Sequence, residues 1–234
     1  MNLEGKIAVV TGVSKGIGLA TVKALLDKGM QVAGWGRTAP ELQHDNFHFF
    51  ECDVRYNESV QRAFDQTIAR LGVHISVLVN NAGMGVAALL EETSLDEWHT
   101  MFETNVNGIF YCTRLVLPGM KELEEGHVIN ISSIAGTTGV EGMSGYCGTK
   151  HAVRGISHSL YKEVRSYGVK VTCIYPGSVQ TNFFDNIDQV IASDNMMRPE
   201  DIASTILHAL ESHPNYHHVD IEVRPLMPKG KIKK

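Results

Sequence analysis

The sequence has few cysteines and no close pair of them. Cys52, Cys112, Cys147 and Cys173 stand far apart, a spacing that fits neither a zinc site nor a redox dithiol. Reduced thiols in a cytosolic protein are the simplest account, so we expect a cytoplasmic location. The sequence also has no apolar run of about 18 residues and no charged leader followed by an apolar stretch, so neither a membrane span nor secretion is predicted.

An excess of positive charge is absent as well. The net charge is −5 at pH 7, whereas nucleic acids are bound by basic faces, so we expect no nucleic-acid partner. The basic residues within 227–234 are predicted to form a frayed tail. His213, His217 and His218 stand among Ser, Pro and Asn, which is typical of a surface loop, and we predict no metal site.

What is present is an alternation of strand-like and helix-like segments without internal repeats or a linker rich in Pro, Gly and Ser. This alternation predicts an α/β fold, a doubly wound parallel sheet with helices on both faces. We expect a single domain over 1–226. The expected strands are 7–12, 31–36, 48–54, 75–80, 127–132, 170–175 and 219–224, and the expected helices are 16–28, 57–71, 94–124, 145–167 and 199–211.

A glycine-rich turn follows the first apolar run. Ile7-Ala8-Val9-Val10 leads into Thr11-Gly12-Val13-Ser14-Lys15-Gly16-Ile17-Gly18, and a helical pattern comes next. Glycines let the backbone turn sharply and approach an anion, while the helix N-terminus offers unpaired N–H groups. Such a unit is either a merely structural turn or a site for a dinucleotide pyrophosphate.

Small, polar or turn-forming residues stand at the carboxyl end of every expected strand except the last. In open parallel sheets, ligands bind beyond the carboxyl ends of the strands. The sequence therefore predicts a site along one edge of the sheet. The residues at these ends are Gly12-Val13-Ser14, Gly36-Arg37, Asp53-Val54, Asn80-Asn81-Ala82-Gly83, Ser132-Ser133 and Pro176-Gly177.

Tyr146 and Lys150 stand four residues apart on an expected helix and so share a face. An ammonium ~4 Å away at an effective dielectric of ~20 contributes roughly 4 kcal/mol, enough to lower a phenol pKa from about 10 to about 7. Tyr146 would then suit general acid/base chemistry. The alternative is that Lys150 extends its ammonium to solvent and Tyr146 is an aromatic filler.

Two further residues could complete this chemistry. Ser133 follows the strand 127–132 and could donate to the same substrate oxygen, or it could simply satisfy a turn. Ser132 competes for the role, but adjacent strand residues face opposite ways. Asn105 interrupts an apolar helical stripe. It either caps a local irregularity or holds a water that connects Lys150 to solvent as a proton relay.

These motifs, together with Pro176 to Thr181, resemble the short-chain dehydrogenase/reductase family in its short, single-domain branch. The resemblance covers essentially the whole chain and implies a Rossmann-type fold with seven parallel strands. It implies Tyr146 as the acid/base, Lys150 on the nicotinamide ribose, Ser133 orienting the carbonyl and Asn105 completing the relay. It also implies a homodimer or homotetramer that pairs through the helices 94–124 and 145–167. The expected cofactor contacts are Gly12, Ser14, Lys15, Gly16, Ile17, Gly18, Arg37, Asp53, Val54, Asn81, Ala82, Gly83, Tyr146, Lys150, Pro176, Gly177, Val179 and Thr181.

The end of the second strand favours NADP(H) over NAD(H). NAD sites usually place an acid there to bind the ribose 2′-OH, whereas this chain has Trp35-Gly36-Arg37-Thr38. Arg37, together with Lys15 in the glycine-rich turn, would attract a 2′-phosphate. An arginine can also stack on the adenine without contacting a phosphate.

The substrate is expected to be a small or medium, largely apolar carbonyl or alcohol. Met84, Met143, Phe183 and Phe184 would give it an apolar wall. Reduction of a 3-oxoacyl thioester on a carrier protein or CoA is the alternative within the same class. The C-terminus lacks the glycine-rich ending frequent in such ketoreductases, which counts against this alternative. A non-catalytic protein that senses a dinucleotide is the alternative of another class, although it need not keep Asn105, Ser133, Tyr146 and Lys150 together.

Overall fold

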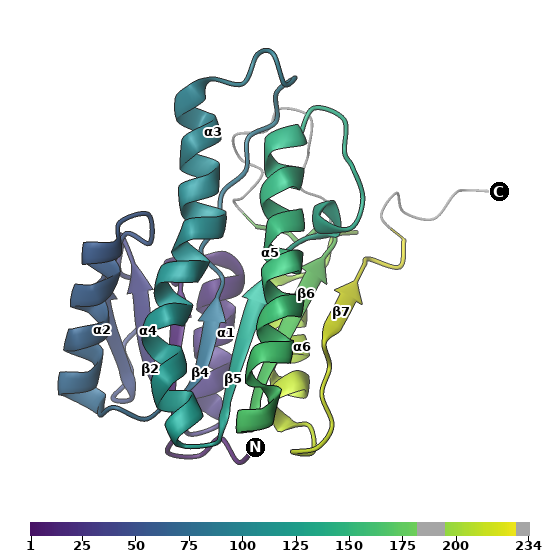
Figure 1. The fold of residues 1–234 in the computed structure, drawn as a ribbon. Helices are drawn as coiled ribbons and strands as arrows, with labels where there is room; N and C mark the ends of the chain where they lie inside the picture. The colour runs from purple at the N-terminus through teal and green to yellow at the C-terminus, as the bar shows by residue number, and fades with distance from the viewer. Residues whose placement is uncertain (182–194, 228–234) are drawn as a thin grey trace.

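The computed structural model describes residues 1–181 and 195–227. In this part of the chain, seven parallel strands form one sheet in the order β3-β2-β1-β4-β5-β6-β7 (Figure 1). The order reverses between β1 and β4, which is the place where this class of sheet binds its ligand. The strands are β1 (Ile7–Thr11), β2 (Gln31–Gly36), β3 (Phe47–Glu51), β4 (Ile75–Asn80), β5 (Gly126–Ile131), β6 (Val169–Pro176) and β7 (Asp220–Val223).

Helices cover both faces of the sheet, as the sequence predicted. On one face, Ala8 and Val10 of β1 pack with α1 and α6, and on the other, Val9 packs with α2, α4 and α5. Figure 1 shows α2, α4 and α5 in front of the sheet and α1 and α6 behind it. Because strands buried on both faces need apolar side chains in both directions, their sequences are continuous apolar runs. The helices are α1 (Gly16–Asp27), α2 (Asn57–Leu71), α3 (Leu95–Phe102), α4 (Gly108–Glu122), α5 (Ser144–Val164) and α6 (Pro199–Glu211).

The expected helix 94–124 is not continuous, which corrects the sequence prediction. It begins with a capping box, in which Ser94 and Glu97 each accept from the other's backbone. After α3, a π-helical turn spans Glu103–Asn107, and α4 follows. A π turn inserts one extra residue, and it is common at functional sites. Asn105 lies in it with its side chain fully buried and bonded to another segment. This long-range bonding is invisible to a helical pattern.

Strand β3 ends at Glu51 rather than at residue 54. Asp53 and Val54 therefore belong to the connection to α2, where the Asp53 N–H donates to the Ser59 hydroxyl at 3.0 Å. Strand β7 covers only 220–223 of the expected 219–224, and β6 extends to Pro176. These differences lie at element ends, where sequence patterns are least informative.

No helix within residues 1–181 and 195–227 is long and apolar enough to cross a membrane. The same described residues hold no cluster of three His, Cys, Asp or Glu side chains arranged to bind a metal ion. The three histidines do lie in a loop, between α6 and β7. The structure does not describe Phe183 or Phe184. Of the basic tail predicted over 227–234, it describes only Met227.

Candidate active site

A cavity of about 460 Å³ opens beyond the carboxyl ends of the strands, across the point where the strand order reverses. Its walls come from the glycine-rich turn, the ends of β2, β4, β5 and β6, and the start of α5. Every expected cofactor residue except Gly18 lines it, and Ser133 and Met84 line it too. The tertiary structure therefore brings the expected set together from segments up to about 170 residues apart.

Gly18 supports the cavity without lining it. A Cβ there would lie 2.1 Å from the Gly12 carbonyl oxygen and 2.6 Å from Asn81 Nδ2, so only glycine lets α1 begin this close to the turn. Gly12 itself has φ +71°, and its Cβ would lie 2.9 Å from Ala82 Cα. The sequence singled out both glycines as cofactor contacts, but Gly18 lies outside the cavity lining and its place in the structure is explained by the packing of the helix against the turn.

The glycine-rich turn is bound to the end of β4 by two polar side chains. The Thr11 hydroxyl accepts from the N–H groups of Asn81 at 3.0 Å and Ala82 at 2.9 Å. In return, Asn81 Nδ2 donates to the carbonyls of Thr11 at 2.9 Å and Gly12 at 3.1 Å. These four bonds hold the two loops on either side of the strand-order reversal, and they fix the shape of the cavity floor.

Tyr146 and Ser133 meet at one end of the cavity. Tyr146 is 8% exposed, and burial raises the pKa of its phenol to about 12, while a side-chain hydrogen bond with Ser133 lowers it. Ser132 points elsewhere, because its hydroxyl donates to the Lys150 carbonyl at 3.0 Å. Both serines line the cavity, but it is Ser133 that bonds to the Tyr146 side chain.

Lys150 lies beside Tyr146 with its side chain buried. Its Nζ donates to the Ile131 carbonyl at 2.9 Å and lies 5.7 Å from the centre of the Tyr146 ring. Burial lowers the pKa of Lys150 to about 8. The sequence estimate that this ammonium lowers the Tyr146 pKa to about 7 was wrong. Burial removes water from both groups and favours their neutral forms, so it raises the pKa of Tyr146 and lowers that of Lys150.

Asn105 lies behind the cavity wall rather than in it. Its Oδ1 accepts from the Met84 N–H at 2.9 Å, and its Nδ2 donates to the Met84 carbonyl at 2.8 Å. The side chain therefore pairs with the backbone of the segment after β4, much as a neighbouring strand would. Of the two interpretations of Asn105, these contacts match the cap of a local irregularity, and the relay stays a prediction.

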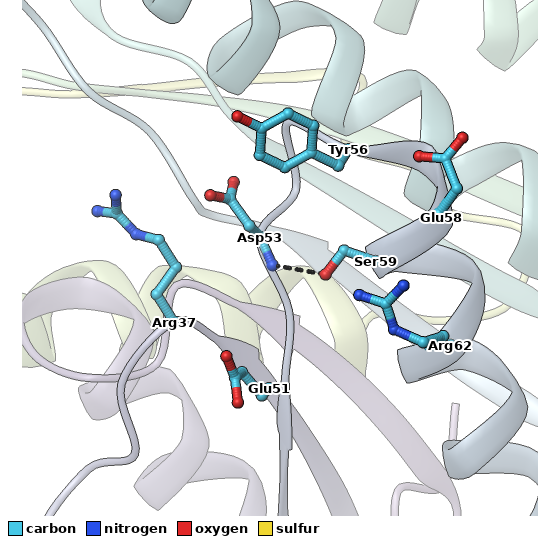
Figure 2. Close-up of a pocket in the computed structure, with 7 residues that line it drawn as sticks. All are labelled: Arg37, Glu51, Asp53, Tyr56, Glu58, Ser59 and Arg62. Carbon is cyan, nitrogen blue, oxygen red and sulfur yellow. Dashed lines mark hydrogen bonds between the residues drawn. The ribbon is translucent and has the colours of Figure 1, made fainter.

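The other end of the cavity is charged. Arg55 grips the Asp53 carboxylate with two nitrogens, at 3.0 and 2.6 Å, and this bonding holds the pKa of Asp53 below its usual value. Arg37 borders both this cavity and a second hollow of about 510 Å³. Figure 2 shows Arg37 on one side of that second hollow and Ser59 and Arg62 of α2 on the other, with Asp53 between them and its N–H bonded to Ser59.

The chain is similar to proteins of one known family along most of its length. The family model for the short chain dehydrogenases matches residues 6–191. The chain belongs to this family. It is 32% identical to an uncharacterized oxidoreductase of Staphylococcus saprophyticus over 240 residues, which cover 96% of this chain and 97% of that one.

Two solved structures of similar proteins carry a nucleotide. A serine dehydrogenase complexed with NADP+ is 30% identical, with a TM-score of 0.84 and coverage of 93% of this chain and 94% of that chain. An alcohol dehydrogenase of the archaeon Thermococcus sibiricus, complexed with 5-hydroxy-NADP, is 27% identical, with a TM-score of 0.87 and coverage of 98% and 100%. The chain is therefore an oxidoreductase of the short chain dehydrogenase family with the Rossmann-type fold expected for it.

A cluster rich in sulfur packs around Tyr146 in this dehydrogenase. Met84 and Met143 pack with Met101, Cys147 and Tyr146 in one cluster. Met84 lines the cavity, whereas Met143 lies outside its lining. The sequence singled out Met84 and Met143 for the substrate wall, which stays a prediction, and passed over Met101, which is 1% exposed. Its helical spacing from Asn105 was the available signal.

Sequence reasoning also missed several lining residues. Trp35 is fully buried, and its Nε1 donates to the Thr67 hydroxyl at 2.9 Å. Its position next to Gly36 and Arg37 was the available signal for Trp35. Arg55 follows Val54 directly, but no sequence pattern indicated that it lines the cavity. Its bonding to Asp53 depends on how the backbone turns after β3. The other missed residues are Thr38, Cys52, Gly85, Thr100, Thr104 and Ile131. Ser132 lines the cavity as well, although the sequence analysis preferred Ser133.

Proposed function

We propose that this dehydrogenase transfers a hydride between NADP(H) and the carbonyl or alcohol carbon of a small or medium, largely apolar substrate. The observation that carries the proposal is the meeting of Ser133, Tyr146 and Lys150 in one cavity with the glycine-rich turn. The cavity fits a dinucleotide, because the turn lets its backbone approach a phosphate at Gly12 and Gly16. These two residues carry no side chain and adopt φ values of +71° and +60°, which favour glycine. The nicotinamide would supply or accept the hydride.

Ser133 and Tyr146 perform the proton chemistry in this proposal. In the reducing direction, their hydroxyls hold the substrate oxygen, and Tyr146 donates its proton as negative charge develops there. Burial supports the acid role, because a phenol whose pKa is about 12 stays protonated at neutral pH. Lys150, whose pKa is lowered to about 8, remains mostly charged at pH 7 and stabilises the phenolate that forms.

The NADP(H) preference rests on charge at the other end of the cavity. The Asp53 carboxylate is already bound by Arg55, so it opposes a nearby phosphate less than a free carboxylate would. Arg37 borders the cavity on the same side and would meet a 2′-phosphate. The NADP-bound relatives carry this same cofactor or a derivative of it.

The substrate class rests on the lining beside Tyr146. The residues there are Met84, Gly85, Thr100 and Thr104, and the charged lining residues other than Lys150 belong to the nucleotide end. An uncharged carbonyl compound fits this lining better than an anionic one. We also propose that the protein pairs through α4 and α5, where Phe110 is 56% exposed on α4. Sedimentation measurements would determine the number of subunits.

The test is a screen of ketones, aldehydes, sugars and acyl thioesters, in which the consumption of NADPH is measured by its absorbance. We expect turnover of neutral ketones or aldehydes, and Tyr146→Phe should abolish it while NADPH affinity stays nearly the same. Retained turnover in Tyr146→Phe would remove the proposed acid/base. A protein that binds NADPH tightly but reduces nothing in the screen would favour the dinucleotide sensor instead.

A further inference from the structure

Thr149 places a buried hydroxyl between the π turn that holds Asn105 and the start of α5. It lies on α5 just before Lys150, and it is 0% exposed. Its Oγ1 donates to the Tyr146 carbonyl at 2.8 Å and accepts from Asn105 Nδ2 at 2.9 Å. One hydroxyl thus joins the π turn to the helical turn that carries both Tyr146 and Lys150.

The direction of these bonds follows from their chemistry. A carbonyl oxygen only accepts, so the Thr149 hydroxyl must give its single proton to Tyr146 O. The hydroxyl can then only accept from Asn105, and the carboxamide must present Nδ2 to it. The second Nδ2 proton goes to the Met84 carbonyl, and Oδ1 accepts from the Met84 N–H. Both protons of the Asn105 carboxamide are therefore used.

The segment held by Asn105 borders the reacting groups. A Cβ placed on Gly83 would lie 3.4 Å from Asn105 Oδ1 and 3.6 Å from Lys150 Nζ. Gly83 and Met84 also line the cavity. A shift of the Asn105 carboxamide would therefore move a stretch of cavity wall next to the Lys150 ammonium.

We propose that Thr149 is a positioning residue for the hydride-transfer reaction. Its hydroxyl orients the Asn105 carboxamide and, through it, holds the backbone of Gly83 and Met84 against Lys150 and Tyr146. The proposal rests on the proposed function, because it assigns Thr149 an effect on the step in which Tyr146 takes part. Misplacing reacting groups by about 1 Å is enough to slow an enzyme by ~10²-fold.

The decisive variant is Thr149→Val, which keeps the shape of the side chain and removes the hydroxyl. We expect kcat to fall by about 10-fold or more. The NADPH Kd should stay within about twofold, because the hydrogen bonds of Thr149 and Asn105 reach neither the glycine-rich turn nor Arg37. Thr149→Ser restores the hydroxyl and should recover most of kcat. A purely structural role would lower stability without separating kcat from NADPH affinity.

Thr172→Val is the matched control. Thr172 is also 0% exposed, and its hydroxyl accepts from His127 Nε2 at 2.8 Å and donates to the His218 carbonyl at 2.5 Å. Thr172 therefore has the same bonding pattern as Thr149, but at a distance from the cavity, because Thr172, His127 and His218 are all absent from the cavity lining. We expect this variant to lose stability and keep its kcat at pH 7.5.

Several outcomes would overturn the proposal. It fails if Thr149→Val keeps more than about half of kcat, if Thr149→Ser does not recover it, or if Thr172→Val loses as much. If Thr149→Val does not fold, Thr149→Cys replaces it, since a thiol is close to a hydroxyl in size but bonds weakly; full activity of Thr149→Cys then overturns the proposal. Tyr146→Phe is measured alongside. Its retained turnover would remove the proposed function, whereas inactive Tyr146→Phe with active Thr149→Val removes the role of Thr149 alone.

Discussion

Arg55 and Asp53 form a bidentate ion pair in the lining of the cavity. Arg55 Nε donates to Oδ1 at 3.0 Å, and Nη2 donates to Oδ2 at 2.6 Å. The side chains are 25% and 21% exposed, so water screens the pair only in part. Asp53 is the one acidic residue among the described residues that line the cavity, and the pair neutralises its carboxylate. It therefore predicts an effect of Arg55 on the choice between NADPH and NADH.

Removing Arg55 should weaken NADPH binding more than NADH binding. In Arg55→Ala, the pKa of Asp53 returns toward its usual value, but the carboxylate stays charged at pH 7 and now repels a phosphate. We expect the NADPH Kd to rise about 3- to 10-fold, and the NADH Kd to change less. Arg224→Ala is the matched control, because Arg224 also pairs with an acid two residues earlier, Glu222. A loss of equal size for both nucleotides would contradict this account of the pair.

Arg37 is expected to set the preference itself. Arg37→Asp replaces a cation that borders the cavity with an acid that can bind a ribose 2′-OH. We expect NADPH affinity to fall by ~10- to 100-fold and the preference to turn toward NADH. Energy transfer from Trp35, which lines the same cavity, to the bound reduced nucleotide gives both affinities. Tighter NADH than NADPH binding by the unaltered protein would refute the assigned preference at the outset.

Lys150 should reduce the stability of the fold that contains it. Its pKa is lowered from 10.5 to about 8 by burial, so the neutral form is favoured in the folded state. Stability is therefore lost as pH falls from about 10.5 to about 8, and this loss persists at pH 7. We expect Lys150→Met to raise the free energy of unfolding at pH 7 by about 1–3 kcal/mol while abolishing turnover. Urea unfolding at pH 7 and pH 10 measures this, and the gain should shrink at the higher pH. A less stable variant at pH 7 would show that the bond to the Ile131 carbonyl outweighs the desolvation.

A histidine cluster at the base of the sheet should make the protein sensitive to acid. Burial lowers the pKa of His127 well below its usual value, with the charges of His217, Lys170, the N-terminus and His218 acting in the same direction. Nδ1 of His127 is buried without a hydrogen-bond partner among the described residues. Since the neutral ring is favoured in the fold, stability is lost as pH falls below about 6.5.

The variant His127→Gln tests this sensitivity. Its amide N–H can still donate to the Thr172 hydroxyl, but it carries no titrating charge. We expect the unaltered protein to lose stability between pH 7.5 and pH 5 in urea unfolding, and His127→Gln to lose less. The lowered pKa values of His217 and His218 leave part of the dependence in place. Parallel pH curves for the two proteins would contradict the role of His127.

Two glycines in helices should respond to alanine in opposite ways. A Cβ on Gly18 would lie 2.1 Å from the Gly12 carbonyl oxygen, whereas one on Gly155 meets nothing within 4 Å. Gly18→Ala must displace the glycine-rich turn, so we expect a loss of about 2–3 kcal/mol and impaired NADPH binding. Gly155→Ala should stabilise α5 by about 0.5–1 kcal/mol. Thermal unfolding with and without NADPH compares them, and equal Tm values would show that the turn yields without strain.

The sequence by itself determined the order of strands and helices and the edge of the sheet that carries the site. These follow from local patterns, because the period of apolar residues decides helix or strand and glycine decides where a turn can form. The pairs Tyr146 with Lys150 and Gly12 with Gly18 were legible for the same reason. Their spacing lies within one helix or one turn.

Only the tertiary structure decided which groups these residues meet. The bidentate bonding of Asp53 by Arg55, the bond of Ser132 to the Lys150 carbonyl, and the π turn around Asn105 all depend on the path that the backbone takes in the folded chain. The pKa of Tyr146 also reversed from the sequence estimate, because spacing gives the distance to a charge but not the loss of water around it. The burial of Tyr146 and Lys150 results from packing of the whole chain, and their four-residue spacing does not encode it.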